Sequence, residues 1–324
     1  MRRVIVLMKK VWRSLAFRVE LTLETWRDST RYCRHNPSLS ISHSGNREHL
    51  ESDIIQRYHV LEKGLSMRDF HPRFGKELVI QLVKMLRDWD SGGYPQDHCQ
   101  ILSAKATLSA YLQRHEVLGV DIQDILPDIP REPSLAPGGV KSYFPISGSH
   151  KESFEAVLRT RASVRSFLPL EPEKHIIESA VEVARFTPSV CNRQTWRVHV
   201  YFGNDAQKVL KLQNGNRGFG HLVPCVLVVT SDLRYFAGVT ERYQAWIDGG
   251  MFSMSLLLQL HAMGLGAVSL NWSVMNDQDV ALRASADIPD SERIIMLIGC
   301  GYPAPETSVA VSARKPVSHF LTFH

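Results

Sequence analysis

Two stretches in the second half of the chain decide the fold: Arg161-Ala-Ser-Val-Arg165 and Pro188-Ser-Val-Cys-Asn-Arg-Gln-Thr-Trp196. In an extended segment, alternate side chains point to the same face, so Arg161, Ser163 and Arg165 are predicted to lie together. Two guanidinium groups beside a hydroxyl group suit a phosphate monoester. Taken alone, however, the first stretch is equally well interpreted as an exposed basic turn.

The second stretch favours a ligand site. Asn192 and Gln194 stand just before an alternating segment, 196–202, that is predicted to be a strand. Their amide groups each offer hydrogen-bond donors and acceptors. Together the two stretches predict a site for a polar, phosphate-bearing ligand.

Composition indicates an ordinary soluble globular protein. The 324 residues suggest two domains. The five cysteines are scattered and make no Cys/His cluster with metal-ligand spacing. This pattern favours reduced thiols in a cytoplasmic protein, without a disulfide framework or a zinc site.

The positive charge is concentrated at the N-terminus. Residues 1–35 hold nine Lys/Arg and three acids, which is +6, so the rest of the chain carries −1 of the total of +5. Residues 1–34 are predicted to form an amphipathic helix with tryptophans, too short in its apolar runs to span a membrane. Such a helix either packs on the protein with a solvated basic face or lies on the inner membrane surface. No nucleic-acid-binding motif accompanies the charge.

The chain is predicted to divide into a helical N-terminal extension (1–126), a Pro-rich linker (127–149) and a second domain (150–324). In the extension we expect helices over 51–66, 76–90 and 97–118. Gly64 is expected to end the first of these helices, and Asp97 to cap the third.

The second domain alternates helices with strands, but no G-x-G-x-x-G follows any strand, which argues against a dinucleotide-binding Rossmann unit. The helix that Asp248 is expected to open is apolar almost all round and needs cover on every side. The expected helices are 150–159, 173–186, 204–212, 248–263 and 277–285, and the expected strands are 196–202, 225–230, 267–271 and 293–299.

With these motifs in order, residues 150–324 resemble the FMN-dependent nitroreductase family. The matching pieces are the two stretches above, Gly249-Gly250, Gly264-Leu-Gly266, Gly301-Tyr-Pro303 and Arg314-Lys-Pro316. The resemblance implies an α+β fold with a central, mainly antiparallel sheet flanked by helices. It also implies an intertwined homodimer with FMN at the subunit interface.

The resemblance also implies the residues that bind FMN. The first motif would hold the phosphate and atoms on the pyrimidine side of the flavin, and Arg314 with Lys315 would complete the phosphate site. The second stretch would meet the flavin, in part from the other subunit. The segment after Gly266 would line the other side of the ring. The implied residues are Arg161, Ala162, Ser163, Arg165, Pro188, Ser189, Val190, Asn192, Gln194, Leu270, Asn271, Arg314 and Lys315.

The implied activity is hydride transfer from NADH or NADPH to the flavin and then to a small acceptor in the same pocket, with ping-pong kinetics. Tyr235, Arg242 and Tyr243 are candidates for acceptor contacts, with ordinary surface packing as the alternative. No catalytic acid is identified. In the extension, His59–Met67 and Pro72–Gly75 look like segments of relatives associated with surface-polysaccharide synthesis.

Two other functions stay open. Some relatives use the flavin without nicotinamide, to fragment reduced FMN or to dehalogenate an aromatic compound. Alternatively, the extension caps the pocket, and the chain is a non-catalytic flavin-binding module of a membrane-associated glycan-synthesis complex.

Overall fold

The computed structural model describes residues 2–36, 47–67, 70–125, 138–140, 149–305, 307, 309–310 and 316–324. Its centre is an antiparallel sheet of four strands in the order β1-β2-β4-β3. The strands are β1 (Trp196–Phe202), β2 (Cys225–Asp232), β3 (Gly266–Asn271) and β4 (Glu292–Gly301). The predicted α+β class and antiparallel sheet are confirmed.

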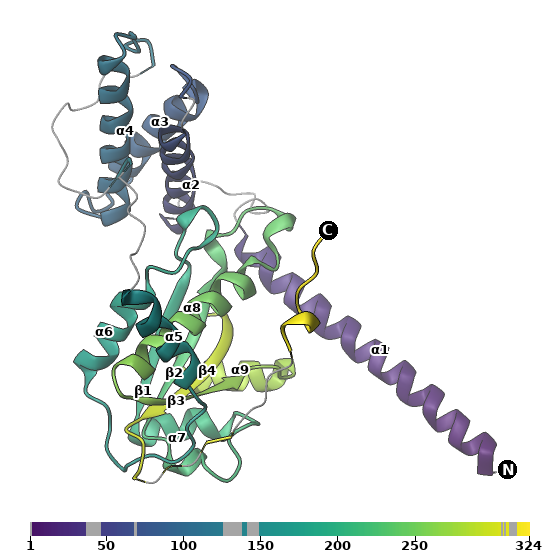
Figure 1. Ribbon diagram of the computed structural model, residues 1–324. Helices are drawn as coiled ribbons and strands as arrows, with labels where there is room; N and C mark the ends of the chain where they lie inside the picture. The colour runs from purple at the N-terminus through teal and green to yellow at the C-terminus, as the bar shows by residue number, and fades with distance from the viewer. Residues whose placement is uncertain are drawn as a thin grey trace.

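Both faces of the sheet are buried, because successive side chains alternate. On β2, Val226 and Val228 pack with α7 (Gly203–Lys211) and α9 (Asn276–Ala286), whereas Leu227 and Val229 pack with α6 (Lys174–Ala184) and α8 (Gln244–Ala262). Helix α5 (Ser149–Thr160) lies beside α8, as Figure 1 shows. Strand β3 is at the edge of the sheet, a position that proves important for the site.

The N-terminal extension forms its own helical core. Helices α2 (Arg47–Ser66), α3 (Lys76–Ser91) and α4 (Cys99–Val117) enclose buried residues such as Leu61, Leu82 and Trp89. Gly64 does not end the first helix, because α2 continues to Ser66; a side chain there would meet the Phe74 ring at 2.0 Å. Asp97 is not the cap of α4 either, since His98 occupies the N-cap position. Most of the predicted linker lies outside the described residues.

Helix α1 (Arg2–His35) is a single long element that extends away from the rest of the molecule (Figure 1). Its C-terminal third is anchored: the Tyr32 hydroxyl donates to the Gly238 carbonyl at 2.7 Å, and Tyr32 packs on Leu233 and Phe236. Farther toward the N-terminus its side chains are exposed, with Trp12 at 71%. Among the described helices, none is long and apolar enough to cross a bilayer.

Five short 3-10 turns complete the described fold. Two of them, η4 (Leu233–Tyr235) and η5 (Val239–Glu241), lie between β2 and α8. The others are η2 (Val190–Asn192), η3 (Gly220–Leu222) and η6 (Val317–His319).

Candidate functional site

The first motif lies against the start of strand β3. Ser163 forms a parallel bridge with Ala267, and the Val164 amide donates to the Ala267 carbonyl at 3.0 Å. Gly266 permits this close approach, because a Cβ atom there would meet the Val164 side chain at 2.8 Å. The motif is therefore extended and pinned to the sheet edge.

The two arginines of the motif differ in their surroundings. Arg161 is half-buried, and its Nε atom is buried without any hydrogen-bond partner among the described residues. Arg165 is exposed; its guanidinium donates to the Ser163 carbonyl at 3.3 Å and lies 5.7 Å from the Phe219 ring. Leaving a buried guanidinium N–H without a partner is costly unless a ligand accepts a hydrogen bond from it. The motif thus fits a bound anion such as the phosphate of FMN.

Beyond Ala267, the outer edge of β3 has no further strand in the described structure. Ser269 and Asn271 point to the α8 side of the sheet and are exposed. Leu270 points the opposite way and is buried in the α7/α9 core, so it can offer a ligand only its backbone. A flat ligand extending from Arg161 along β3 would meet Asn271 at the far end.

The second stretch forms a tight loop around η2. Three of its residues have positive φ angles, which are uncommon for residues other than glycine: Cys191 at 48°, Asn192 at 55° and Gln194 at 52°. Each such residue costs about 1–3 kcal/mol, and this kind of strain gathers at functional sites. Backbone hydrogen bonds within the loop hold it, and the Ser189 hydroxyl accepts from the Gln194 amide at 3.0 Å.

Two buried charged residues that sequence reasoning did not identify support this loop. Asp248 accepts from the Val190 amide at 3.1 Å and from the Gln244 side chain at 2.8 Å, and burial raises the pKa of its carboxyl. Arg193 is buried and pairs with Glu241 at 2.6 Å. Asp248 therefore lies inside α8, which begins at Gln244, and does not open the helix as expected.

The helical extension also holds the loop. The Tyr58 hydroxyl on α2 donates to Gln100, and α2 packs against η2. Next to it, the Ser52 hydroxyl donates to the Tyr235 carbonyl at 2.8 Å. The extension is thus packed directly on the predicted flavin loop.

Within one chain the two motifs lie at opposite ends of the sheet. Ala267 pairs with Cys300, which pairs with Cys225, whereas Trp196, just after Gln194, pairs with Ser231. On β2, the first motif is therefore level with Cys225 and the second stretch with Ser231. These two positions are six residues apart, which is about 20 Å at ~3.3 Å per residue. One chain does not bring the two motifs together.

The three residues expected to contact the acceptor are also separated. Tyr235 is buried beneath α2, with its hydroxyl 3.1 Å from Glu51, and burial raises the pKa of that hydroxyl. Arg242 and Tyr243 lie at the start of α8, where the guanidinium is 4.4 Å from the Tyr243 ring centre and Tyr243 is 61% exposed. Arg314 and Lys315 lie outside the described residues.

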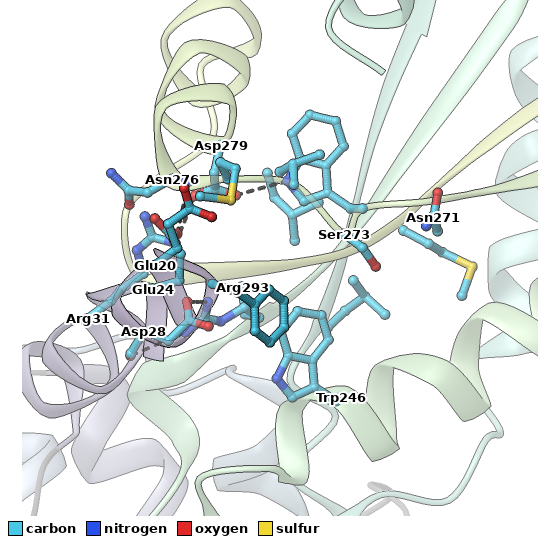
Figure 2. Close-up of a pocket in the computed structure, with 17 residues that line it drawn as sticks. Glu20, Glu24, Asp28, Arg31, Trp246, Asn271, Ser273, Asn276, Asp279 and Arg293 are labelled. Atoms are coloured by element: carbon cyan, nitrogen blue, oxygen red, sulfur yellow. Dashed lines mark hydrogen bonds and ion pairs between the residues drawn. The ribbon is translucent and has the colours of Figure 1, made fainter. Parts of the chain in front are cut away.

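A cavity of about 570 Å³ opens beside Asn271. Figure 2 shows Asn271 and Ser273 on one side of it and the carboxylates of α1 on the other, with Trp246 of α8 nearby. Its volume is within the range of small-molecule sites. In the part of the chain that the structure describes, no group of three or more His, Cys, Asp or Glu residues is arranged to hold a metal ion.

Comparison with known proteins identifies the second domain. The sequence model of the nitroreductase family matches residues 158–214 and 203–302. The chain is 22% identical to 4-nitrobenzoate reductase of Pseudomonas putida over 231 residues, which are 53% of this chain and 97% of that protein. It is 25% identical to an NADH dehydrogenase of Thermus thermophilus, over 45% of this chain and 84% of the relative.

Among solved structures, the chain is similar to a Desulfovibrio desulfuricans protein in complex with FMN, at 20% identity and a TM-score of 0.46, covering 53% of this chain and 96% of the other. The family match covers the sheet, the first motif and the η2 loop, and begins after α1 to α4. Residues 158–302 therefore match the nitroreductase family, and helices α1 to α4 precede that match.

Proposed function

We propose that the protein is an FMN-dependent oxidoreductase that uses NADH or NADPH to reduce a small acceptor. The observation that carries this proposal is that Arg161, whose buried Nε has no hydrogen-bond partner among the described residues, lies beside the exposed edge of β3. The names of the relatives, a 4-nitrobenzoate reductase and an NADH dehydrogenase, support the same reaction type. Bound FMN would supply the redox chemistry, taking hydride from the nicotinamide and passing electrons to the acceptor.

The residues of this chain would bind and orient the cofactor. Arg161, Ser163 and Arg165 would hold the phosphate together with Arg314 and Lys315, because a dianion removed from water needs several cations. The Leu270 backbone and the Asn271 side chain would face the ring. The η2 loop (Pro188, Ser189, Val190, Asn192 and Gln194) would close the site.

The η2 loop would come from a second copy of the chain. Within one chain the η2 loop and the first motif are about 20 Å apart along the sheet, at a rise of about 3.3 Å per residue, which supports this arrangement. The outer face of α8 also leaves apolar side chains in solvent: Ile247 is 52% exposed, Met251 39% and Met254 38%. A groove of about 490 Å³ between α5, α6 and α8 continues this apolar surface. A homodimer would cover both surfaces.

The proposal is tested on the purified full-length protein. We expect a yellow protein with bound FMN that oxidises NADH or NADPH when a nitroaromatic acceptor is added. Colourless protein that fails to take up added FMN would refute it. Rapid oxidation of NADH or NADPH without loss of flavin would also exclude the two alternative functions. The first is FMN fragmentation or dehalogenation without nicotinamide, and the second is a non-catalytic flavin-binding module.

We also propose that α1 lies on the inner surface of the cytoplasmic membrane. The supporting observation is the inverted polarity of the helix: Glu24, Asp28 and Arg31 face the protein, whereas Trp12 and Trp26 are 71% and 65% exposed. Exposed tryptophans next to basic residues suit the headgroup region of an anionic bilayer. The predicted association with surface-polysaccharide synthesis is consistent with a membrane location and stays a prediction.

Vesicle co-sedimentation tests the membrane contact. Full-length protein should bind vesicles containing anionic lipid, and the variant Trp12→Gln/Leu15→Gln should bind less. Val117, on α4, is 79% exposed, so Val117→Gln is the matched control. Equal sedimentation of all three proteins would remove this part of the proposal.

A further inference from the structure

The cavity beside Asn271 has a wall that the nitroreductase-family domain does not supply. Helix α1 contributes one side, from Phe17 to Arg31. The loop after β3 (271–276), the start of β4 (293–296) and Trp246 of α8 contribute the rest. Because α1 precedes the family match at residue 158, this wall is a feature of this chain. The cavity thus lies between the predicted end of the flavin and an added helix.

Three aromatic side chains contribute to the lining of the cavity. The indole rings of Trp246 and Trp272 and the ring of Phe17 line it, together with two methionines. The Trp272 indole N–H donates to Asp279 at 2.9 Å, which fixes the orientation of its ring. Aromatic walls of this kind bind planar rings by stacking and edge contacts. The shape therefore suits an aromatic acceptor.

The two arginines in the wall are already neutralised. Arg31 pairs with Asp279 at 2.8 Å and also with Asp290. Arg293 pairs with Asp28 and lies 5.4 Å from the Trp246 ring centre. Neither guanidinium is available as the main partner of an anionic ligand without breaking these contacts.

One carboxylate in the wall is not neutralised. Glu24 accepts from Arg27 and from the Asn276 amide. Glu20, one turn earlier on the same side of α1, is exposed and makes no hydrogen bond or ion pair with any described residue. The other three carboxylates that line the cavity are paired with arginines, so Glu20 is the lining charge that remains to favour a cation.

We propose that this cavity is the acceptor pocket and that Glu20 selects aromatic acceptors carrying a cationic nitrogen. The proposal rests on the function proposed above, because the flavin is expected to end at Asn271. It assigns α1 a role in specificity: Phe17 and the two indoles bind the ring, and Glu20 meets the positive charge at the opening. Anionic aromatic compounds such as 4-nitrobenzoate are disfavoured by the same carboxylate.

Binding tests the pocket without requiring turnover. Three probes share a nitrobenzene ring: 4-nitrobenzyltrimethylammonium, 4-nitrobenzyl alcohol and 4-nitrobenzoate. Titration calorimetry on the purified full-length protein should give affinities in that order. Glu20→Gln should reduce the preference for the cation over the alcohol by about two- to fivefold, as expected for one exposed charge. Glu20→Lys should reverse it.

The control is Glu116→Gln, which removes an exposed carboxylate on α4 and should leave all three affinities unchanged. Phe17→Ala should weaken binding of all three probes alike and leave the charge preference intact. Equal affinity of the wild-type protein for cation and alcohol, or a preference unaffected by Glu20→Gln, would overturn the inference. Failure of the proposed function would look different: the protein would hold no FMN and would not oxidise NADH or NADPH with any of the three probes.

Discussion

The anchor of helix α1 at Asp290 can be tested quantitatively. The Asp290 carboxylate accepts from Arg31 at 3.1 Å, from Arg34 at 2.6 Å and from His35 at 3.0 Å. Partial burial opposes ionisation, but the hydrogen bond from His35 and the charges of Arg31 and Arg34 lower the Asp290 pKa from 3.8 to about 2. Asp290→Asn removes the charge and leaves a side chain of similar shape.

The structure sets the size of the effect. A difference of 3.8 − 2 in pKa corresponds to about 2.4 kcal/mol. The Asp290 side chain is 42% exposed, so solvent screening reduces the net contribution to about 1 kcal/mol. Loss of this amount should increase local opening of the anchored end of α1 about fivefold.

Hydrogen exchange of the amides of residues 28–36 measures this opening. At pH 7 we expect faster exchange in Asp290→Asn and unchanged exchange in the sheet. Because the folded pKa is depressed, the stabilisation is present above the unfolded pKa and is lost as pH falls from about 4 to about 2. The difference between wild type and variant should therefore shrink across that range.

The matched control is Asp287→Asn. Asp287 is exposed and has a φ of 52°, a conformation that asparagine tolerates well. It should leave exchange in α1 unchanged. If Asp290→Asn also leaves it unchanged at pH 7, the carboxylate does not anchor α1.

Three further substitutions test other parts of the fold and site. Tyr58→Phe removes the hydroxyl that donates to Gln100 from the helix packed against the η2 loop, so it should lower FMN affinity several-fold and cost about 1 kcal/mol in urea unfolding; unchanged affinity would mean that this hydroxyl does not position the loop. Gly266→Ala places a methyl group 2.8 Å from Val164, so both Tm and FMN content should fall, and wild-type values for both would contradict the close packing. Glu292 is buried and accepts from His199 at 2.7 Å and from Thr230, so Glu292→Gln should cost about 2 kcal/mol at pH 7. Burial opposes ionisation of Glu292, but these hydrogen bonds lower its pKa. The cost should therefore shrink as pH falls below 4.5, and a cost independent of pH would show that the ionised carboxylate is not what stabilises this contact.

The regular elements could be predicted because each has a clear period. Alternation identified the strand at Trp196–Phe202, and the long apolar run identified α8. Single boundary residues were predicted less well, because tertiary contacts decide them. Asp248 resembles a helix cap in sequence but is buried to support the η2 loop, and Gly64 resembles a helix end but makes room for Phe74.

The site was only partly predictable, for physical reasons. Local sequence predicted a ligand-binding role for Arg161, Ser163 and Asn192, because guanidinium, hydroxyl and amide groups near a strand indicate a ligand. It could not indicate the pairing of Arg193 with Glu241 or the packing of α2 on the η2 loop, since these depend on segments far apart in the chain that meet only after folding. The cavity under α1 was not predicted, because the contacts of Glu24 and Asp28 with the second domain join segments far apart in the chain.

The central claim is that each flavin site is shared by two chains. A heterodimer test addresses it directly: one chain carries Arg161→Ala and the other Asn192→Ala/Gln194→Ala, each with its own affinity tag. Homodimers of either variant should bind no FMN. In the tandem-purified heterodimer both lesions fall in one site and leave the other intact, so the absorbance spectrum should show about one FMN per dimer. A heterodimer without FMN would mean that both motifs act within a single chain and would contradict the account.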